Sequence, residues 1–126
     1  MADRRKKQNP EIDFELRFFE GIIKQNPDYI EALIPLAEIY TRHGFYKKGL
    51  EMDQRLAKLC QDDPVVFYNL ACSCALLGRK REALNALKRA IKLGYRDFDH
   101  LLKDPDLKGL HVEPDFKKAL EGIGNT

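Results

Sequence analysis

Apolar residues recur along this chain every three or four positions, with charged residues between them. That period is typical of amphipathic α-helices, and no stretch alternates apolar and polar residues for long enough to indicate a strand. The pattern therefore predicts an all-helical protein. The expected helices cover residues 10–25, 27–43, 47–60, 64–77 and 80–93, with a short helix at 97–103 and one or two short helices between 105 and 122.

Prolines and glycines indicate where these helices begin and end. Asparagine or aspartate caps the free backbone N–H groups of a helix, and proline fits the first helical position. The polar–proline pairs are Asn9-Pro10, Asn26-Pro27, Asp63-Pro64, Asp104-Pro105 and, with a poorer cap, Glu113-Pro114. Gly44, Gly78 and Gly94 follow apolar-periodic stretches, as expected of left-handed residues just past a helix. Pro35 lies inside the expected 27–43 helix, which predicts either a kink or a later helix start.

The sequence also repeats itself at a period of 34 residues. Large apolar, small and glycine positions coincide through a whole helix–turn–helix unit, as expected of a solenoid in which each unit covers the apolar face of its neighbour. The coinciding pairs include Leu33 with Phe67, Leu36 with Leu70, Ala37 with Ala71, Gly44 with Gly78 and Gly49 with Ala83.

The stretch PVVFYNLACSCALLGRKREALNALKRAIKLG, residues 64–94, resembles a tetratricopeptide repeat. The positions that carry the resemblance are Phe67, Leu70, Ala71, Gly78, Ala83 and Ala90. Residues 30–63 match less well, because Gly49 stands at the first small position of the second helix and Asp53 replaces a large residue. The resemblance implies a right-handed, all-α solenoid of antiparallel helix pairs.

We therefore expect a basic, disordered tail at 1–9 and a single domain at 10–126. The parts of that domain are a capping helix at 10–26, a degenerate repeat at 27–63, a strong repeat at 64–95, and a truncated third repeat with a capping tail at 96–126. Residues 104–120 are similar to a tail that follows the last repeat in many bacterial tetratricopeptide proteins. The residues expected to cover the final apolar face are Leu107, Leu110, Phe116 and Leu120.

Composition adds constraints on class and compartment. The 126 residues are 44% hydrophobic and 33% charged, and no apolar run approaches the length that crosses a bilayer. The basic N-terminal stretch is not followed by an apolar stretch long enough for a signal peptide. The three cysteines cannot all be paired in disulfides within the chain, because their number is odd. A cytoplasmic location is the simplest interpretation. The net charge of +2 is unevenly distributed, with acidic residues dominating 11–40 and basic residues dominating 79–92.

Cys72 and Cys74 are the most suggestive chemical groups in the sequence. Two residues on a helix are separated by about 200° of rotation, so these thiols cannot share a metal or form a disulfide with each other. Cys74 shares its stripe with Phe67 and Leu70 and is predicted to be core, whereas Cys72 is predicted to be a groove-lining or partly buried neutral thiol. We find no motif for catalysis, metal binding or a cofactor, and we expect no enzyme.

The resemblance implies that the first helices of the repeats line a concave groove. The predicted function is a non-enzymatic scaffold that binds a protein partner there, through a peptide or helix carrying apolar anchors and some Lys or Arg. The alternatives are nucleic-acid binding through the basic tail and the 79–92 helix, which is disfavoured, and a cysteine-based redox or metal protein. The predicted groove residues are Glu31, Ile34, Glu38, Arg42, Val65, Tyr68, Asn69, Cys72, Leu76, Leu102 and Lys103.

The 10–25 helix carries more apolar surface than a capping helix needs. Ile12, Leu16, Phe19 and Ile23 form one stripe, which suffices to cap the solenoid. Phe14, Phe18 and Ile22 form a second one, which we name the outer stripe. The outer stripe is predicted either to pack on the loop at Tyr29 and Phe45 or to form an interface with a partner or in a homodimer.

Overall fold

The computed structural model describes residues 10–124, so the predicted tail at 1–9 lies outside the described residues. No strand occurs within 10–124, and none of the helices there is long and apolar enough to cross a membrane. The elements are α1 (Pro10–Gln25), α2 (Ile30–Arg42), α3 (Tyr46–Leu59), α4 (Pro64–Leu76), α5 (Lys80–Lys92), α6 (Phe98–Lys103), a 3-10 helix η2 (Pro105–Leu107) and α7 (Pro114–Gly124).

The helix starts follow the 34-residue period through the whole described chain. The helices α2, α4 and α6 begin 34 residues apart in succession, and so do α3, α5 and α7. The six-residue α6 agrees with the predicted early break of the third repeat, yet α7 returns in the register of a second helix. The end of α1 lies 34 residues before the end of α3, so α1 also occupies the place of a second helix.

Side-chain capping accounts for the starts of α4, α6 and η2, whereas α2, α3 and α5 begin without a side-chain cap hydrogen bond. The Asp63 carboxylate accepts hydrogen bonds from the backbone N–H groups of Val65 and Val66, and Pro64 opens α4, as predicted. The Asp104 carboxylate caps η2 in the same way by accepting from Asp106 N.

The helix α2 begins at Ile30 instead of Pro27, which confirms the predicted alternative of a later helix start. The backbone of Asn26 is used in closing α1, because its N–H donates to the carbonyl of Ile22 and its carbonyl accepts from Tyr29 N. The next helix therefore begins only at Ile30. Pro35 nevertheless lies inside α2, so the later start does not remove it from the helix.

Glycines serve two purposes in this fold. Gly44, Gly78 and Gly94 have positive φ values of 86°, 75° and 118°, which side chains with a Cβ rarely adopt. Gly49 instead permits a close approach of α2 and α3, because a Cβ there would collide with the Thr41 Oγ1 atom. The small residue that the repeat pattern requires at this position is thus explained by helix packing.

The described helices form two apolar cores along the solenoid. The N-terminal core lies among α1, α2 and α3 around Leu33 and Leu36, with Val66 of α4 added to it. The C-terminal core gathers α4, α5, α6, η2 and α7 around Leu87, with Leu50 of α3 added to it. Cys74 is buried in the C-terminal core, as predicted. The predicted covering residues also pack there, with Leu107, Leu110 and Phe116 buried and Leu120 half-buried.

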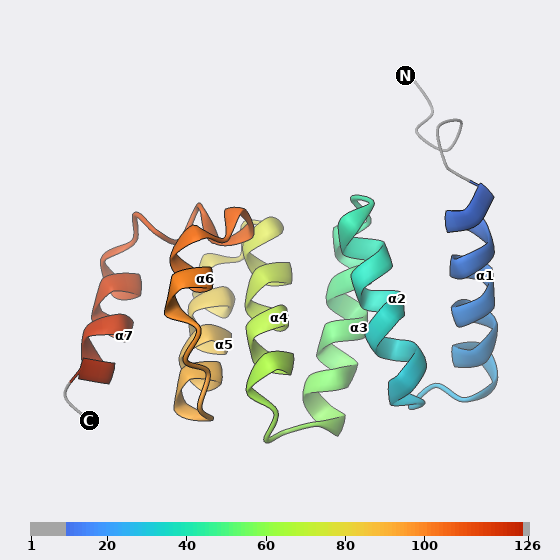
Figure 1. Ribbon diagram of the computed structural model, residues 1–126, viewed down its shortest axis with the longest axis horizontal. Helices are drawn as coiled ribbons and strands as arrows, with labels where there is room; N and C mark the ends of the chain where they lie inside the picture. Colours follow the sequence, from blue (N-terminus) through green and yellow to red (C-terminus); the bar gives the residue numbers. More distant parts are fainter. Residues whose placement is uncertain (1–9, 125–126) are drawn as a thin grey trace.

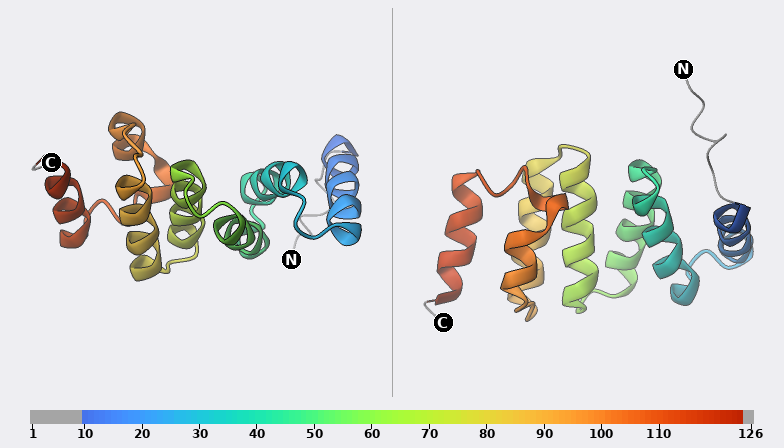
Figure 2. Two further views of the ribbon diagram at one scale, coloured as in Figure 1. Left: turned by 90° about the horizontal axis from the view of Figure 1, so that it is seen from below. Right: turned by 45° about the horizontal axis from the view of Figure 1, so that its top comes forward.

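The helices stand in a row, with α1 at one end and α7 at the other (Figures 1 and 2). The first helices α2, α4 and α6 lie on the near side of Figure 1, and α3 and α5 lie behind them. The last helix, α7, packs against α5 and covers the end of the C-terminal core. This arrangement places the first helices of all three units along one side of the molecule.

Candidate functional site

Most of the predicted groove residues are exposed on α2, α4 and α6. Three of them are apolar side chains open to solvent, namely Ile34 at 52%, Val65 at 55% and Leu102 at 51%. The exposed polar and charged members are Glu31, Glu38, Arg42, Asn69 and Lys103, while Leu76 is half-buried.

The repeat period relates these exposed positions to one another. Ile34 and Leu102 stand two repeat periods apart at one repeat position, which the buried Tyr68 occupies on α4, and the exposed Glu31 and Val65 share the position three residues earlier. Residues three apart on a helix are surface neighbours, so Glu31 and Ile34 lie on one face of α2, and Val65 lies on the corresponding face of α4. Because α2, α4 and α6 line one side of the row, these faces form one surface, which we name the first-helix surface.

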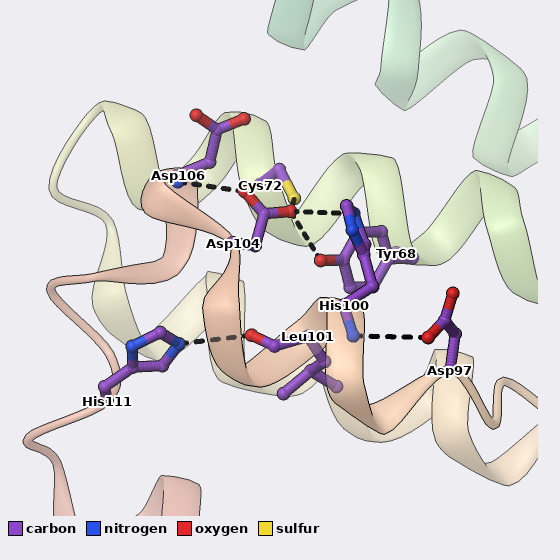
Figure 3. A network of polar contacts seen from close by, with 8 residues as sticks. All are labelled: Tyr68, Cys72, Asp97, His100, Leu101, Asp104, Asp106 and His111. Carbon is purple, nitrogen blue, oxygen red and sulfur yellow. Dashed lines mark hydrogen bonds and ion pairs between the residues drawn. The ribbon is translucent and has the colours of Figure 1, made fainter.

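Tyr68 and Cys72 do not line an open groove, and this part of the prediction is corrected. Both side chains are buried, and each donates a hydrogen bond to the carboxylate of Asp104, the residue between α6 and η2 (Figure 3). The donor–acceptor distances to Asp104 Oδ2 are 2.5 Å from the Tyr68 hydroxyl and 3.6 Å from the Cys72 Sγ.

Aromatic packing adds to this closure of α4. The ring of Tyr95 stacks on that of Tyr68, with centroids 4.4 Å apart and planes 6° from parallel. His100 Nε2 lies 3.3 Å from Asp104 Oδ2, and its ring is 5.7 Å from that of Tyr68. His111 Nε2 lies 3.2 Å from the carbonyl oxygen of Leu101, which holds the segment after η2 to α6. We name Tyr68, Cys72 and Asp104 with Tyr95 and His100 the Asp104 cluster.

Burial and negative charge keep the thiol and the phenol of the Asp104 cluster protonated. Burial raises the pKa of the Cys72 thiol, and the nearby Asp104 and Asp106 carboxylates raise it further. Burial and the hydrogen bond to Asp104 likewise raise the pKa of Tyr68. A thiol of this kind is a poor nucleophile, because the thiolate is the reactive form.

The atoms of Cys72, Asp104 and Asp106 that could ligate a metal lie within 4.8 Å of one another. Sequence reasoning missed this meeting, because 32 residues separate Cys72 from Asp104 and only the packing of η2 against α4 joins them. The Asp104 carboxylate already accepts hydrogen bonds from the Tyr68 hydroxyl, the Cys72 thiol and the backbone N–H of Asp106 (Figure 3). The Asp104 carboxylate therefore acts as a structural anchor that joins η2 to α4.

The outer stripe of α1 lies largely open. Phe14 is 70% exposed and Phe18 is 54% exposed, and their rings stack at a centroid distance of 6.3 Å. Ile22 is half-buried against the N-terminal core. The predicted packing of Phe14 and Phe18 on the loop at Tyr29 and Phe45 is wrong, because both rings are exposed. The residues of α1 that pack on the core with Phe45 are Leu16, Phe19, Ile22 and Ile23.

Polar contacts fix α1 in this orientation. The Tyr40 hydroxyl of α2 donates a hydrogen bond to the Glu20 carboxylate of α1. The Lys48 ammonium lies 5.6 Å from the centre of the Tyr40 ring and 5.9 Å from that of Phe45. These residues, with Asp13, Leu16 and Arg17, line a cleft between α1 and the next helix pair. The side of α1 that carries Phe14 and Phe18 therefore faces away from the solenoid.

Comparison with known proteins supports the helical-repeat fold. No family model matches the chain. The chain is 32% identical over 85 residues to a chloroplastic protein of Arabidopsis thaliana, an alignment that covers 65% of this chain and a quarter (25%) of that protein. The name of that relative places it in the chloroplast, and the predictions of a cytoplasmic location and a bacterial source for this chain stay predictions.

Solved structures resemble almost the whole chain. A crystal structure of MamA matches with a TM-score of 0.73 at 22% identity, covering 96% of this chain and 72% of that one. A second MamA structure matches with a TM-score of 0.73 at 23% identity, covering 94% and 64%. MamA is a tetratricopeptide-like helical-repeat protein, and this chain has the same kind of fold.

Proposed function

We propose that this chain is a non-enzymatic interaction module that binds a peptide or helix of a protein partner along the first-helix surface. The observation that carries the proposal is the exposure of Ile34, Val65 and Leu102, one apolar side chain on each first helix. Apolar side chains spaced along one side of a solenoid suit a partner that presents several apolar anchors in succession.

The charges beside these anchors favour a basic partner. Glu31 and Glu38 are exposed on α2 on either side of Ile34 along the helix, and Arg42 lies one turn beyond them. On α6, Lys103 gives the other end of the surface a positive charge. We therefore expect a partner segment whose Lys or Arg residues meet α2 and whose apolar residues meet Ile34, Val65 and Leu102.

The proposal is favoured over nucleic-acid binding because several basic residues of the 79–92 segment already form ion pairs or hydrogen bonds within the chain. Arg79 pairs with Glu82, Lys80 pairs with Glu113, and Arg89 reaches the backbone carbonyl of Gln61. A redox function is disfavoured by the raised pKa of the buried Cys72 thiol.

The test is selection of peptides from a random display library on the purified chain, followed by measurement of their affinities. We expect enriched peptides to combine apolar residues with Lys or Arg. Ile34→Arg should weaken their binding about tenfold or more, because it removes an anchor and adds repulsion. Exchanging both acids, as Glu31→Lys with Glu38→Lys, should do the same at low salt and less at high salt.

Val112→Arg is the matched control, because Val112 is an exposed apolar residue outside the first helices. Peptides that bind this control and Ile34→Arg equally well would place the binding surface elsewhere. Salt-sensitive binding to a single-stranded oligonucleotide, with no peptide enriched, would favour the nucleic-acid alternative.

A further inference from the structure

The helix α2 is buried on most of its circumference and is open along one narrow stripe. Its exposed residues are Glu31, Ile34, Glu38 and Arg42, which we name the α2 stripe. They follow one another at spacings of three, four and four positions, so they lie on one line along the helix. Such spacings are those of the contact residues of two helices that pack lengthwise. The α2 stripe therefore has the layout of a surface that a second helix covers along its length.

The equivalent positions of α4 show how such a stripe is covered within the chain. Tyr68 and Cys72 stand at the repeat positions of Ile34 and Glu38, and both are buried. Each donates a hydrogen bond to the carboxylate of Asp104, so two donors meet one acceptor. On α2 the same two positions are exposed, and they present an apolar side chain and an acceptor. A matching occupant of the α2 stripe therefore supplies an apolar residue and a basic donor.

The charges of the α2 stripe give this occupant an order. From the N-terminal to the C-terminal end, the stripe reads acid, apolar, acid, base. No ion pair joins Glu31, Glu38 or Arg42 to another residue within 10–124. Pro35 has no backbone N–H, so the carbonyl of Glu31 lacks its usual helical donor and adds a second acceptor at the N-terminal end. The two acidic positions favour basic residues of the partner, and the Arg42 position favours an acidic one.

We propose that the α2 stripe binds a helix of the partner protein that runs antiparallel to α2. Read from its own N-terminus, this helix carries an acidic, a basic, an apolar and a second basic residue at spacings of four, four and three. The acidic residue then meets Arg42, and the apolar residue meets Ile34. The first basic residue meets Glu38, and the second meets Glu31. The inference rests on the proposed function and narrows the peptide or helix expected there to a helix of stated charge order.

The helix dipole of the partner favours the antiparallel direction. In this direction the partner carries its acid near its N-terminus and its bases toward its C-terminus, which stabilises the partner helix itself. A parallel partner would need the reverse order, which opposes its own dipole. The antiparallel helix ends beside the start of α2, at the same edge of the row as the start of α4 (Figure 1). The exposed Val65 lies at that start of α4, where the next residues of the partner would meet it.

The test uses a synthetic alanine-based peptide that carries glutamate, lysine, leucine and lysine at spacings of four, four and three. A covalent staple on the opposite face holds the peptide helical, because so short a helix is marginal in water. The control peptide carries the same residues and staple in reverse order. Isothermal titration of the full chain should show that the first peptide binds at least tenfold more tightly than the control.

Charge reversal tests the register and the direction. Glu38→Lys should weaken binding of the first peptide at least tenfold, and replacing the first lysine of the peptide with glutamate should restore the original affinity. Glu31→Lys should be rescued in the same way by replacing the second lysine. Rescue also verifies that each variant is folded. Glu121→Lys is the matched control, because Glu121 is an exposed acid on α7, and it should leave the affinity unchanged.

The remaining outcomes separate this inference from the proposed function. Rescue of Glu38→Lys by replacing the second lysine instead of the first would overturn the antiparallel direction. Equal affinity for the two peptides, or no binding of the first, would overturn the helical partner. In that case, library peptides whose binding is weakened by Ile34→Arg would leave the proposed function standing. If Ile34→Arg weakens neither the library peptides nor the designed peptide, both proposals fail.

Discussion

Asp53 is a single side chain that opposes the stability of the fold it belongs to. It stands on α3 at a position where the repeat pattern places a large residue, and it is buried with the Ser73 hydroxyl donating to its carboxylate. Burial raises the pKa of Asp53 to about 6 from an ordinary 3.8, and the hydrogen bond from Ser73 offsets only part of that rise. The folded chain therefore binds this proton more tightly than the unfolded chain does.

The sign of the resulting pH dependence follows from that raised pKa. The favourable contribution of protonated Asp53 is complete below about pH 4 and is lost as the pH rises through 6. We expect Asp53→Asn, which stays neutral, to raise the free energy of unfolding at pH 7 by about 1–3 kcal/mol and to have little effect at pH 4. Urea unfolding of both proteins at several pH values measures the difference.

Asp62→Asn is the control, because Asp62 is exposed in the connection between α3 and α4. The free energy of unfolding of this variant should follow that of the parent chain at every pH. If Asp53→Asn loses stability at pH 7, the cost of orphaning an amide N–H beside Ser73 exceeds the cost of the buried charge, and the argument from burial fails.

The short helix α6 depends on one carboxylate for its place in the fold. Asp104 ends α6, caps η2 and accepts hydrogen bonds from Tyr68 and Cys72 of α4. A six-residue helix has little stability of its own, so its position must come from tertiary contacts. The Asp104 cluster supplies those contacts and closes the middle of the predicted groove.

We expect Asp104→Ala to release α6 and η2 from α4 and to expose Cys72. The change leaves the Tyr68 hydroxyl without its buried acceptor, at a cost of about 1–3 kcal/mol. It also removes a negative charge that raises the pKa of Cys72, so the thiolate fraction increases. In a Cys60→Ser background, the reaction of Cys72 with a thiol reagent at pH 8 should accelerate at least tenfold.

Asp97→Ala provides the comparison for this element. Asp97 caps the start of α6 through His100 N, so its removal weakens the helix but leaves the Asp104 cluster intact. If Cys72 reacts equally fast in the Asp97 and Asp104 variants, loss of the helix rather than loss of the anchor exposes the thiol.

Helix-level features were largely predictable from the sequence, because they depend on near neighbours. Asp63 and Pro64 begin α4 through contacts within three residues, and the 34-residue period carries the same register to α7. The later start of α2 was one of two predicted alternatives, and it arises because Asn26 serves the preceding helix instead of the following one. The burial of Tyr68 was missed because it depends on Asp104, 36 residues away. A distant hydrogen bond leaves no periodic signal in the sequence.

The whole molecule is organised as two cores in series, which separates the consequences of a mutation along its length. The N-terminal core includes Leu33 and Leu36, and the C-terminal core includes Leu87 and Phe116. In a solenoid each unit contacts its neighbours alone, so stability is approximately a sum of local and nearest-neighbour terms. The acidic 11–40 segment and the basic 79–92 segment likewise lie in different parts of this linear array of helices.

Phe116→Ala tests this separation at the far end from α1. Phe116 is buried where α7 closes the C-terminal core, so its truncation should cost about 3 kcal/mol through lost apolar contact and the cavity left behind. In native-state hydrogen exchange, amides of α5 should then exchange faster by a factor of about 100, while those of α2 keep their parental rates. Val112→Ala, at an exposed site just before α7, should change neither set. If the amides of α2 exchange faster by the same factor as those of α5, the two cores unfold as one unit, and a ligand bound at either end would stabilise the whole solenoid.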